Sequence, residues 1–231
     1  MTIDSPFRPF EDRFDQDTAL ALLRDAVAGA DDGELFLERR RSEMLSWDDG
    51  RVRNASYDAS EGFGLRAVKG ETAGYAHSTE MTESALRRAV ETARLAVGSG
   101  GGTLADAPPA TNRKLYSDND PMADATFPVK VETLAEIDAF ARSLDNRVVQ
   151  VSASLAASLQ EVVILRPEGH AVSDTRPMTR LNVARSGEEI GRRDSGSSGA
   201  GGRSALSGRM DRVHGEVAAR AGGGLAWGSV G

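Results

Sequence analysis

Three stretches of the chain carry apolar residues at the three- and four-residue spacing of an amphipathic helix. The first runs from Thr18 to Ala30, with Asp15 and Asp17 just upstream as candidate N-terminal caps. The second runs from Thr82 to Val97, and the third from Val129 to Leu144. The pattern therefore predicts three helices, each with one face toward a core.

Between these helices, apolar positions alternate or form blocks of strand length. The predicted strands are 34–47, 51–59, 62–68 and 72–77 in the first half, and 148–155, 159–165, 171–174 and 178–185 in the second. Tight turns are expected at Asp48-Asp49-Gly50, Lys69-Gly70-Glu71 and Pro167-Glu168-Gly169, because glycine accepts the positive φ that such turns require. Short connections between strands favour antiparallel pairing.

The segment Gly98 to Pro109 is rich in Gly, Ala and Pro, a composition typical of a linker. We therefore expect an α+β protein of two modules, each an antiparallel sheet with packed helices, joined by a Gly/Pro linker. The expected ranges are 1–14 for a polar leader, 15–98 for an N-terminal α+β domain, 99–127 for the linker, 128–203 for an incomplete central α+β domain, and 204–231 for a tail rich in Gly, Ala and Arg.

Composition narrows the function classes. The 231 residues hold 28 Lys and Arg against 35 Asp and Glu, a net charge of −7, which argues against nucleic acid as a partner. The absence of cysteine removes thiolate nucleophiles, Cys-ligated metal sites and disulfides. No uncharged apolar run approaches the roughly 18 residues of a membrane span, and the charged start does not resemble a signal peptide. We expect a cytoplasmic protein without a membrane partner.

Two glycine motifs resemble nucleotide-binding loops. Gly62 to Ala67 matches G-x-G-x-x-A, but a strand pattern follows it where the dinucleotide motif needs a helix. These glycines instead let a strand approach another backbone or a ligand closely. The segment Gly196 to Ser204 fails the spacing of a phosphate loop and has Arg203 in place of lysine. We expect this segment to be a loop that is solvated or ordered by a partner.

No catalytic or metal-binding residue can be assigned from local sequence. The histidines His77, His170 and His214 are too far apart to form a zinc motif on one helix. No G-x-S-x-G nucleophile elbow occurs in a strand–turn–helix context. The residues alone therefore indicate two non-catalytic α+β modules.

Several segments nevertheless resemble one known family. The segments Trp47-Asp48-Asp49-Gly50-Arg51-Val52, Glu61 to Val68 and Gly70 to Ala76 resemble the N-terminal domain of the TldD/PmbA family. The segments Arg147 to Leu155, Asp174 to Pro177 and Arg192 to Arg203 resemble its central region, on the TldD side. The likeness runs in order over residues 15–203 and ends after Arg203.

The resemblance implies a cytoplasmic zinc metalloprotease that acts on unfolded or small peptides and pairs TldD with a related subunit, TldE (PmbA). In that family, two histidines of an H-E-x-x-x-H helix and a cysteine hold the zinc, in a C-terminal domain. This chain contains neither the motif nor a cysteine. No catalytic or metal residue is therefore carried over, the peptide-binding residues are unknown, and no cofactor is expected in this chain.

The leading hypothesis is a truncated TldD-like subunit that lacks the catalytic domain and is inactive alone. The alternative is a non-catalytic module for peptide binding or subunit assembly, with a TldE/PmbA-like subunit or a second copy of itself as partner. An extended peptide could add to a sheet edge where Gly62, Gly64 and Gly74 permit close approach, although a purely structural role for these glycines is the other interpretation.

Overall fold

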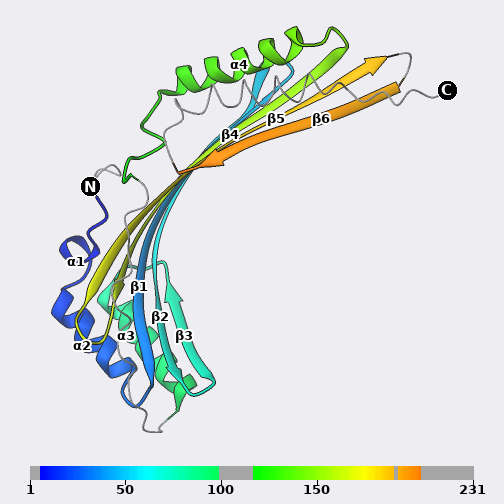
Figure 1. The fold of residues 1–231 in the computed structure, drawn as a ribbon. Helices are drawn as coiled ribbons and strands as arrows, with labels where there is room; N and C mark the ends of the chain where they lie inside the picture. Colours follow the sequence, from blue (N-terminus) through cyan, green and yellow to red (C-terminus); the bar gives the residue numbers. More distant parts are fainter. Residues whose placement is uncertain (1–5, 99–116, 190–191, 204–231) are drawn as a thin grey trace. The chain divides into compact units, whose positions relative to one another are not determined.

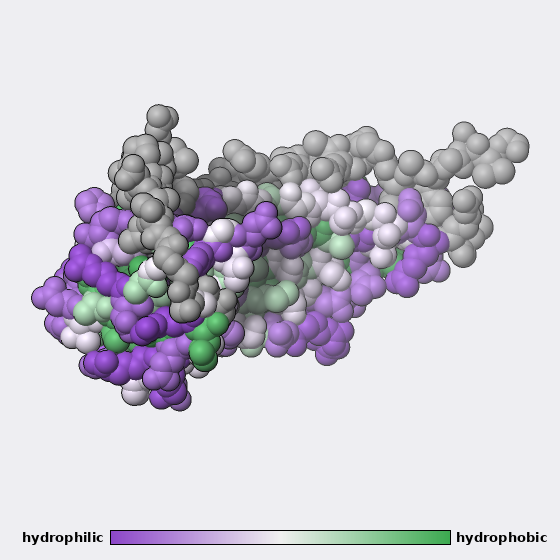
Figure 2. Space-filling view, turned by 90° about the horizontal axis from the view of Figure 1, so that it is seen from below, coloured by the Kyte–Doolittle hydropathy of each residue, from purple (hydrophilic) through white to green (hydrophobic). Residues whose placement is uncertain are grey.

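A computed structural model describes residues 6–98, 117–189 and 192–203 (Figure 1). The first five residues of the expected leader, most of the expected linker (99–116) and the expected tail (204–231), with His214, lie outside the described residues. Among the coloured residues on the face shown in Figure 2, hydrophilic ones predominate, with hydrophobic patches between them.

The three predicted helices are confirmed. They are α2 (Gln16–Ala26), α3 (Glu83–Val97) and α4 (Phe127–Ser143), and a short helix α1 (Pro9–Asp12) precedes them. Asp15 caps α2 by accepting a hydrogen bond from the Thr18 amide, and Thr82 caps α3 through the Ala85 amide. Helix α2 ends four residues before its predicted end, because the chain leaves the helical conformation at Val27 and turns at Gly29, where φ is 80°. The short helix α1 was not predicted.

The α+β class is also confirmed, with its strands in one sheet. The strands are β1 (Asp32–Asp48), β2 (Arg51–Lys69), β3 (Thr72–Ser78), β4 (Val148–Leu165), β5 (Ala171–Glu189) and β6 (Arg192–Gly202), in the order β3-β2-β1-β4-β5-β6. Positive φ angles of 82° at Gly50, 56° at Gly70 and 96° at Gly169 confirm the three predicted turns.

The strands are longer than the sequence pattern predicts. In three places the pattern predicted two strands where the structure has one unbroken strand. The predicted pairs 51–59 and 62–68, 148–155 and 159–165, and 171–174 and 178–185 correspond to β2, β4 and β5. Along β4, every odd-numbered position from Val151 to Leu165 is buried, so the alternation persists through the small residues in the middle. Backbone hydrogen bonds continue a strand across residues whose side chains give no strand signal.

The chain packs into two compact units that do not follow sequence order. Unit 1 comprises Met1–Arg40, Ala59–Lys114 and Gln160–Thr175, and unit 2 comprises Arg41–Asp58, Leu115–Leu159 and Arg176–Gly231. We expected one sheet in each module, but the four long strands β1, β2, β4 and β5 contribute residues to both units. The domain ranges expected along the chain stay a prediction.

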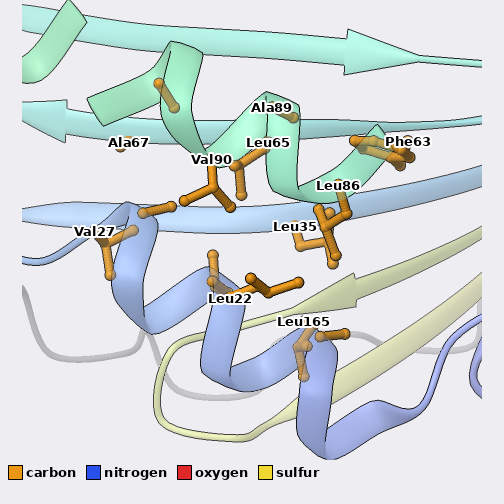
Figure 3. Close-up of a cluster of buried hydrophobic side chains, with 14 of the residues drawn as sticks. Leu22, Val27, Leu35, Phe63, Leu65, Ala67, Leu86, Ala89, Val90 and Leu165 are labelled. Carbon is orange, nitrogen blue, oxygen red and sulfur yellow. The ribbon is translucent and has the colours of Figure 1, made fainter. Parts of the chain in front are cut away.

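The core of unit 1 lies between the strands and helices α2 and α3 (Figure 3). The fully buried leucines are Leu23 of α2, Leu86 of α3, and Leu35, Leu37, Leu65 and Leu165 of the strands. Burying a side chain of this size contributes roughly 1.5–3 kcal/mol. This core attaches both helices to the strands, so the helices are held by tertiary packing.

The core of unit 2 lies between α4 and the strands, and it encloses one carboxylate. Leu134, Ile137 and Ala141 of α4 pack among buried strand residues. Beside them, Asp138 is only 4% exposed. Its Oδ2 atom accepts hydrogen bonds from Trp47 Nε1 at 2.8 Å and from the Gly50 amide at 2.9 Å, and its Oδ1 accepts from Arg142 Nε at 2.6 Å. Asp138 thus ties α4 to the β1–β2 hairpin.

The segment Gly196 to Gly202 is part of a strand, which corrects the expected loop. Strand β6 pairs antiparallel with β5, with Gly196 opposite Arg185 and Gly199 opposite Asn182. Glycine is depleted in strands, so this segment of glycine and serine carries no local strand signal. The pairing depends on the backbone groups that β5 presents, which are distant in sequence.

Candidate functional site

A groove on unit 2 lies on the side of the strands opposite α4. Leu45, Trp47, Val151, Ala153, Leu181 and Val183 face α4 in the core, so the alternating positions between them face the other way. The groove has a volume of about 690 Å³ and is lined by Ser46, Trp47, Asp48, Arg53, Ser152, Ala153, Ser154, Arg180, Asn182, Val183, Ala184, Ser197, Ser198 and Gly199. We call it the polar groove, because hydroxyl, amide and charged groups predominate among these side chains.

A carboxylate at one side of the polar groove is held by three donors. Asp48 Oδ1 accepts hydrogen bonds from Ser152 Oγ at 2.7 Å and from Gln150 Nε2 at 3.0 Å, and Asp48 Oδ2 lies 3.3 Å from an Arg53 nitrogen. The hydrogen bonds from Gln150, then Ser152, hold the pKa of Asp48 below its usual 3.8. Asp48 is therefore ionised at neutral pH and accepts hydrogen bonds.

On β5, Asn182 is fixed by its neighbours. Its Nδ2 donates to Ser154 Oγ at 3.3 Å, and its Oδ1 accepts from Arg180 Nε at 3.0 Å. Opposite it, a Cβ atom placed on Gly199 would stand 2.8 Å from Asn182 Oδ1. Glycine at 199 thus keeps this part of the polar groove open.

The polar groove presents hydrogen-bonding groups that suit binding. Its serine hydroxyls can donate and accept hydrogen bonds, and the Asn182 amide can pair with a peptide group. No histidine or glutamate is among its lining residues. The groove therefore offers contacts for polar main-chain groups.

The glycines Gly62 and Gly64 lie inside β2 and face atoms of the neighbouring strand end. A Cβ on Gly62 would stand 2.9 Å from the Ser78 carbonyl oxygen, and one on Gly64 would stand 2.8 Å from the Tyr75 hydroxyl. No helix follows them, because β2 continues to Lys69. The dinucleotide motif is thus excluded, and the close approach is made by this chain's own residues, which supports the structural interpretation. Gly74 is opposite Ala67 in the same sheet.

The described residues do not fit a zinc site. Within residues 6–98, 117–189 and 192–203, no three His, Cys, Asp or Glu side chains gather closely enough to hold a metal ion. His77 stacks near Tyr75, with ring centroids 5.7 Å apart, and His170 is exposed beside the β4–β5 turn. The buried carboxylates Asp138 and Glu161 are paired with arginines. No chemical step of this chain is therefore derived through zinc.

Among the described residues, no helix combines the length and the apolar character needed to cross a membrane.

Stability at low pH should depend on Asp145. The carboxylate accepts hydrogen bonds from the side chain and the amide of Arg147, and these bonds lower the pKa of Asp145 from 3.8 to about 2. A folded-state pKa below the unfolded value stabilises the fold above pH 3.8, and this contribution is lost as the pH falls toward 2. We expect Asp145→Asn to cost less than about 1 kcal/mol at pH 7 and to flatten the pH dependence of unfolding between these values, measured by urea denaturation. An unchanged pH slope would contradict this role.

Two family models match the chain in succession. Residues 33–97 match a model described as PmbA/TldA metallopeptidase domain 1, and residues 120–225 match one described as PmbA/TldA metallopeptidase central domain. The chain belongs to the PmbA/TldD family. The central-domain match extends past Arg203, where we expected the likeness to this family to end.

Curated relatives of the PmbA/TldD family agree with the models. The chain is 30% identical over 190 residues to a protein named metalloprotease TldD homolog from Buchnera aphidicola (subsp. Acyrthosiphon pisum), covering 82% of this chain and 39% of that protein. It is 32% identical over 193 residues to a protein of the same name from Haemophilus influenzae, and the match covers 82% of this chain and 40% of that protein. The chain thus spans about two fifths of the length of these relatives.

Solved structures of similar proteins share the fold. TldE from Thermococcus kodakarensis has a TM-score of 0.67 at 18% identity, with 87% of this chain and 47% of that chain covered. A putative modulator of a DNA gyrase from Thermotoga maritima has a TM-score of 0.71 at 14% identity, and the match covers 92% of this chain and 47% of that chain. At these identities the comparison shows the fold alone.

Segments that carry the resemblance to the PmbA/TldD family meet at the polar groove. Trp47 and Asp48 come from the segment Trp47 to Val52, Ser152 to Ser154 from Arg147 to Leu155, and Ser197 to Gly199 from Arg192 to Arg203. About a hundred residues of chain separate Asp48 from Ser152, and more than forty separate Ser154 from Ser197. Sequence reasoning found the segments, but only strand order brings them together: β1, β4, β5 and β6 are adjacent.

Proposed function

We propose that this chain supplies the first and central domains of a TldD-like subunit of a cytoplasmic zinc metalloprotease that degrades or processes unfolded or small peptides. Within it, the polar groove contacts the peptide and the described residues take no part in bond cleavage. A TldE/PmbA-like subunit is the proposed partner, because related subunits share this fold. The observation that carries the proposal is the meeting of three family-typical segments at one groove on unit 2.

The groove would hold a peptide without selecting one sequence. Asn182 and the serines at 152, 154 and 197 present donors and acceptors that match main-chain amide and carbonyl groups. At one side of the polar groove, Asp48 supplies a negative charge and Arg53 a positive charge. Contacts to the main chain give affinity with little dependence on side chains, as an enzyme for varied peptides requires.

A matched pair of glycine substitutions tests the polar groove. We expect Gly199→Val to weaken binding of fluorescently labelled unstructured peptides at least about tenfold, which corresponds to about 1.4 kcal/mol, because the new side chain displaces Asn182. Gly196→Val on the same strand is the control, since the nearest atom to its Cβ is 3.9 Å away and Gly196 does not line the groove. Fluorescence anisotropy measures both affinities. Equal effects of the two substitutions would refute the site.

A second measurement separates the enzyme from a non-catalytic module. The chain alone with added zinc is expected to leave peptides intact. Chelator-sensitive cleavage is expected only from a complete family complex that contains a TldE-like subunit. Cleavage by the lone chain would overturn the absence of catalytic residues here, whereas capture of the partner without any cleavage would favour the assembly function.

A further inference from the structure

Part of strand β2 has no strand on its outer side among the described residues. Strand β3 pairs only with Phe63–Lys69, and the neighbours of β2 in the described sheet are β3 and β1 (Figure 1). We call Arg51–Asp58, which lies wholly in unit 2, the β2 edge. Every residue from Arg53 to Asp58 is exposed. An open edge presents backbone N–H and C=O groups that can pair with another chain.

An apolar groove lies beside the β2 edge. It has a volume of about 470 Å³ and is lined by Glu43, Leu45, Ala55, Ser56, Tyr57, Met122, Ala125, Thr126, Phe127 and Lys130. Tyr57 is 53% exposed and Phe127 is 52% exposed, so two aromatic rings face solvent here. The charged residues Lys130 and Glu43 are paired with each other at 2.8 Å. The groove therefore offers apolar surface beside open backbone groups.

The order of charges along the β2 edge indicates its occupant. Arg51 lies at the hairpin end beside Arg53, which is paired with Asp48 at 3.3 Å, and Asp58 lies at the other end. When two copies of this strand align antiparallel, the basic end of each comes near the acidic end of the other, whereas a parallel alignment brings like charges together. Asn54 and Ala55 at the centre are uncharged, and neither has a large side chain. The edge is thus self-complementary, as a two-fold interface requires.

We propose that the β2 edge pairs antiparallel with the β2 edge of a second copy of this chain, which extends the sheet across a two-fold axis. The groove residues Tyr57 and Phe127 then bury apolar surface against the second copy. The inference goes beyond the proposed function and does not depend on it. Peptide binding at the polar groove is tested with Gly199→Val, which does not lie in the β2 edge. The peptide-binding proposal and the strand-pairing proposal can therefore fail separately.

Because the chain has no cysteine, single cysteines report the pairing directly. Asn54 and Ala55 lie directly opposite each other when Arg51 of one copy faces Asp58 of the other. A mixture of Asn54→Cys and Ala55→Cys should therefore bring two cysteines within the roughly 5.5 Å between Cα atoms that a disulfide allows. Two copies of Arg51→Cys should stand about 23 Å apart, because the pairing shifts them by about seven residues of about 3.3 Å each. A mixture of Arg51→Cys and Asp58→Cys should cross-link to each other.

Under mild oxidation, disulfide dimers of the central variants should form at least about tenfold faster than those of Glu91→Cys, an exposed control on α3. Equal rates at all positions would overturn the proposal. Faster cross-linking between two Arg51→Cys copies than between central cysteines would also overturn it, because that result indicates parallel alignment.

Sedimentation of the full 231-residue chain gives the second test. We expect a concentration-dependent dimer whose dissociation constant rises at least about tenfold in Asp58→Arg, while the double variant Arg51→Asp/Asp58→Arg recovers it. Glu91→Arg makes the same charge change elsewhere and should leave the dimer unchanged. A monomer at all concentrations, even one that binds extended peptides, would refute the pairing, as would equal effects of Asp58→Arg and Glu91→Arg.

Discussion

Asp138→Ala is expected to lower the free energy of unfolding by about 3–5 kcal/mol, the cost of breaking a buried charged network. Asp138 accepts hydrogen bonds from Trp47 Nε1, the Gly50 amide and Arg142 Nε. Alanine leaves the Trp47 donor buried without its acceptor and removes one of the links between α4 and the hairpin, leaving the pair Arg142–Asp49. Urea denaturation followed by tryptophan fluorescence measures the loss.

Two controls on the same helix isolate this effect. Asp138→Asn keeps an acceptor for Trp47 and should cost less than alanine. Glu132→Ala changes an exposed carboxylate of α4 and should shift stability by no more than about 0.5 kcal/mol. If Asp138→Ala and Glu132→Ala destabilise equally, the buried network does not hold α4.

Glu161→Ala is expected to destabilise unit 1 by about 3 kcal/mol or more, because it leaves the charge of Arg39 buried. Arg39 is 7% exposed and Glu161 is 9% exposed. The Glu161 Oε2 atom lies 2.7 Å from an Arg39 nitrogen, and Oε1 accepts from the Phe7 amide at 3.1 Å. The Arg39 guanidinium also lies over the Phe7 ring, 5.5 Å from its centroid.

The double variant Arg39→Met/Glu161→Leu separates charge burial from packing. Since apolar residues of similar volume often replace a buried ion pair without loss, it should be more stable than Glu161→Ala by at least about 1 kcal/mol. Thermal and urea unfolding of the wild type, Arg39→Met, Glu161→Leu and the double variant measure the coupling, with Glu161→Ala measured beside them. A double variant as unstable as Glu161→Ala would show that the ion pair supplies more than charge compensation.

Local signals in the sequence predicted the helices and hairpins because these elements form between near neighbours. The three- and four-residue spacing of apolar residues located α2, α3 and α4, and Asp15 and Thr82 act as caps. The glycines at 50, 70 and 169 adopt the positive φ that the turns need. In each case the physical cause lies within a few residues of chain.

Strand β6 and the extent of β2 and β4 were not predictable in the same way. The residues of β6 are almost all Gly and Ser beyond Asp194, and they become a strand only because β5 supplies a hydrogen-bonding edge. The buried charges Arg39 and Asp138 also looked like surface residues, since local sequence does not show which partner will bury them.

The sequence by itself determined the α+β class, the helices, the tight turns and the resemblance to the PmbA/TldD family, because each depends on local periodicity or on residue order. Only the tertiary structure decided that one sheet contributes to two units and that Asp48, Ser152 and Gly199 share one groove. It also showed that no strand among the described residues pairs with the outer side of the β2 edge. Pairing between strands about a hundred residues apart, such as β1 and β4, follows from the packing of the whole chain, which no local pattern encodes.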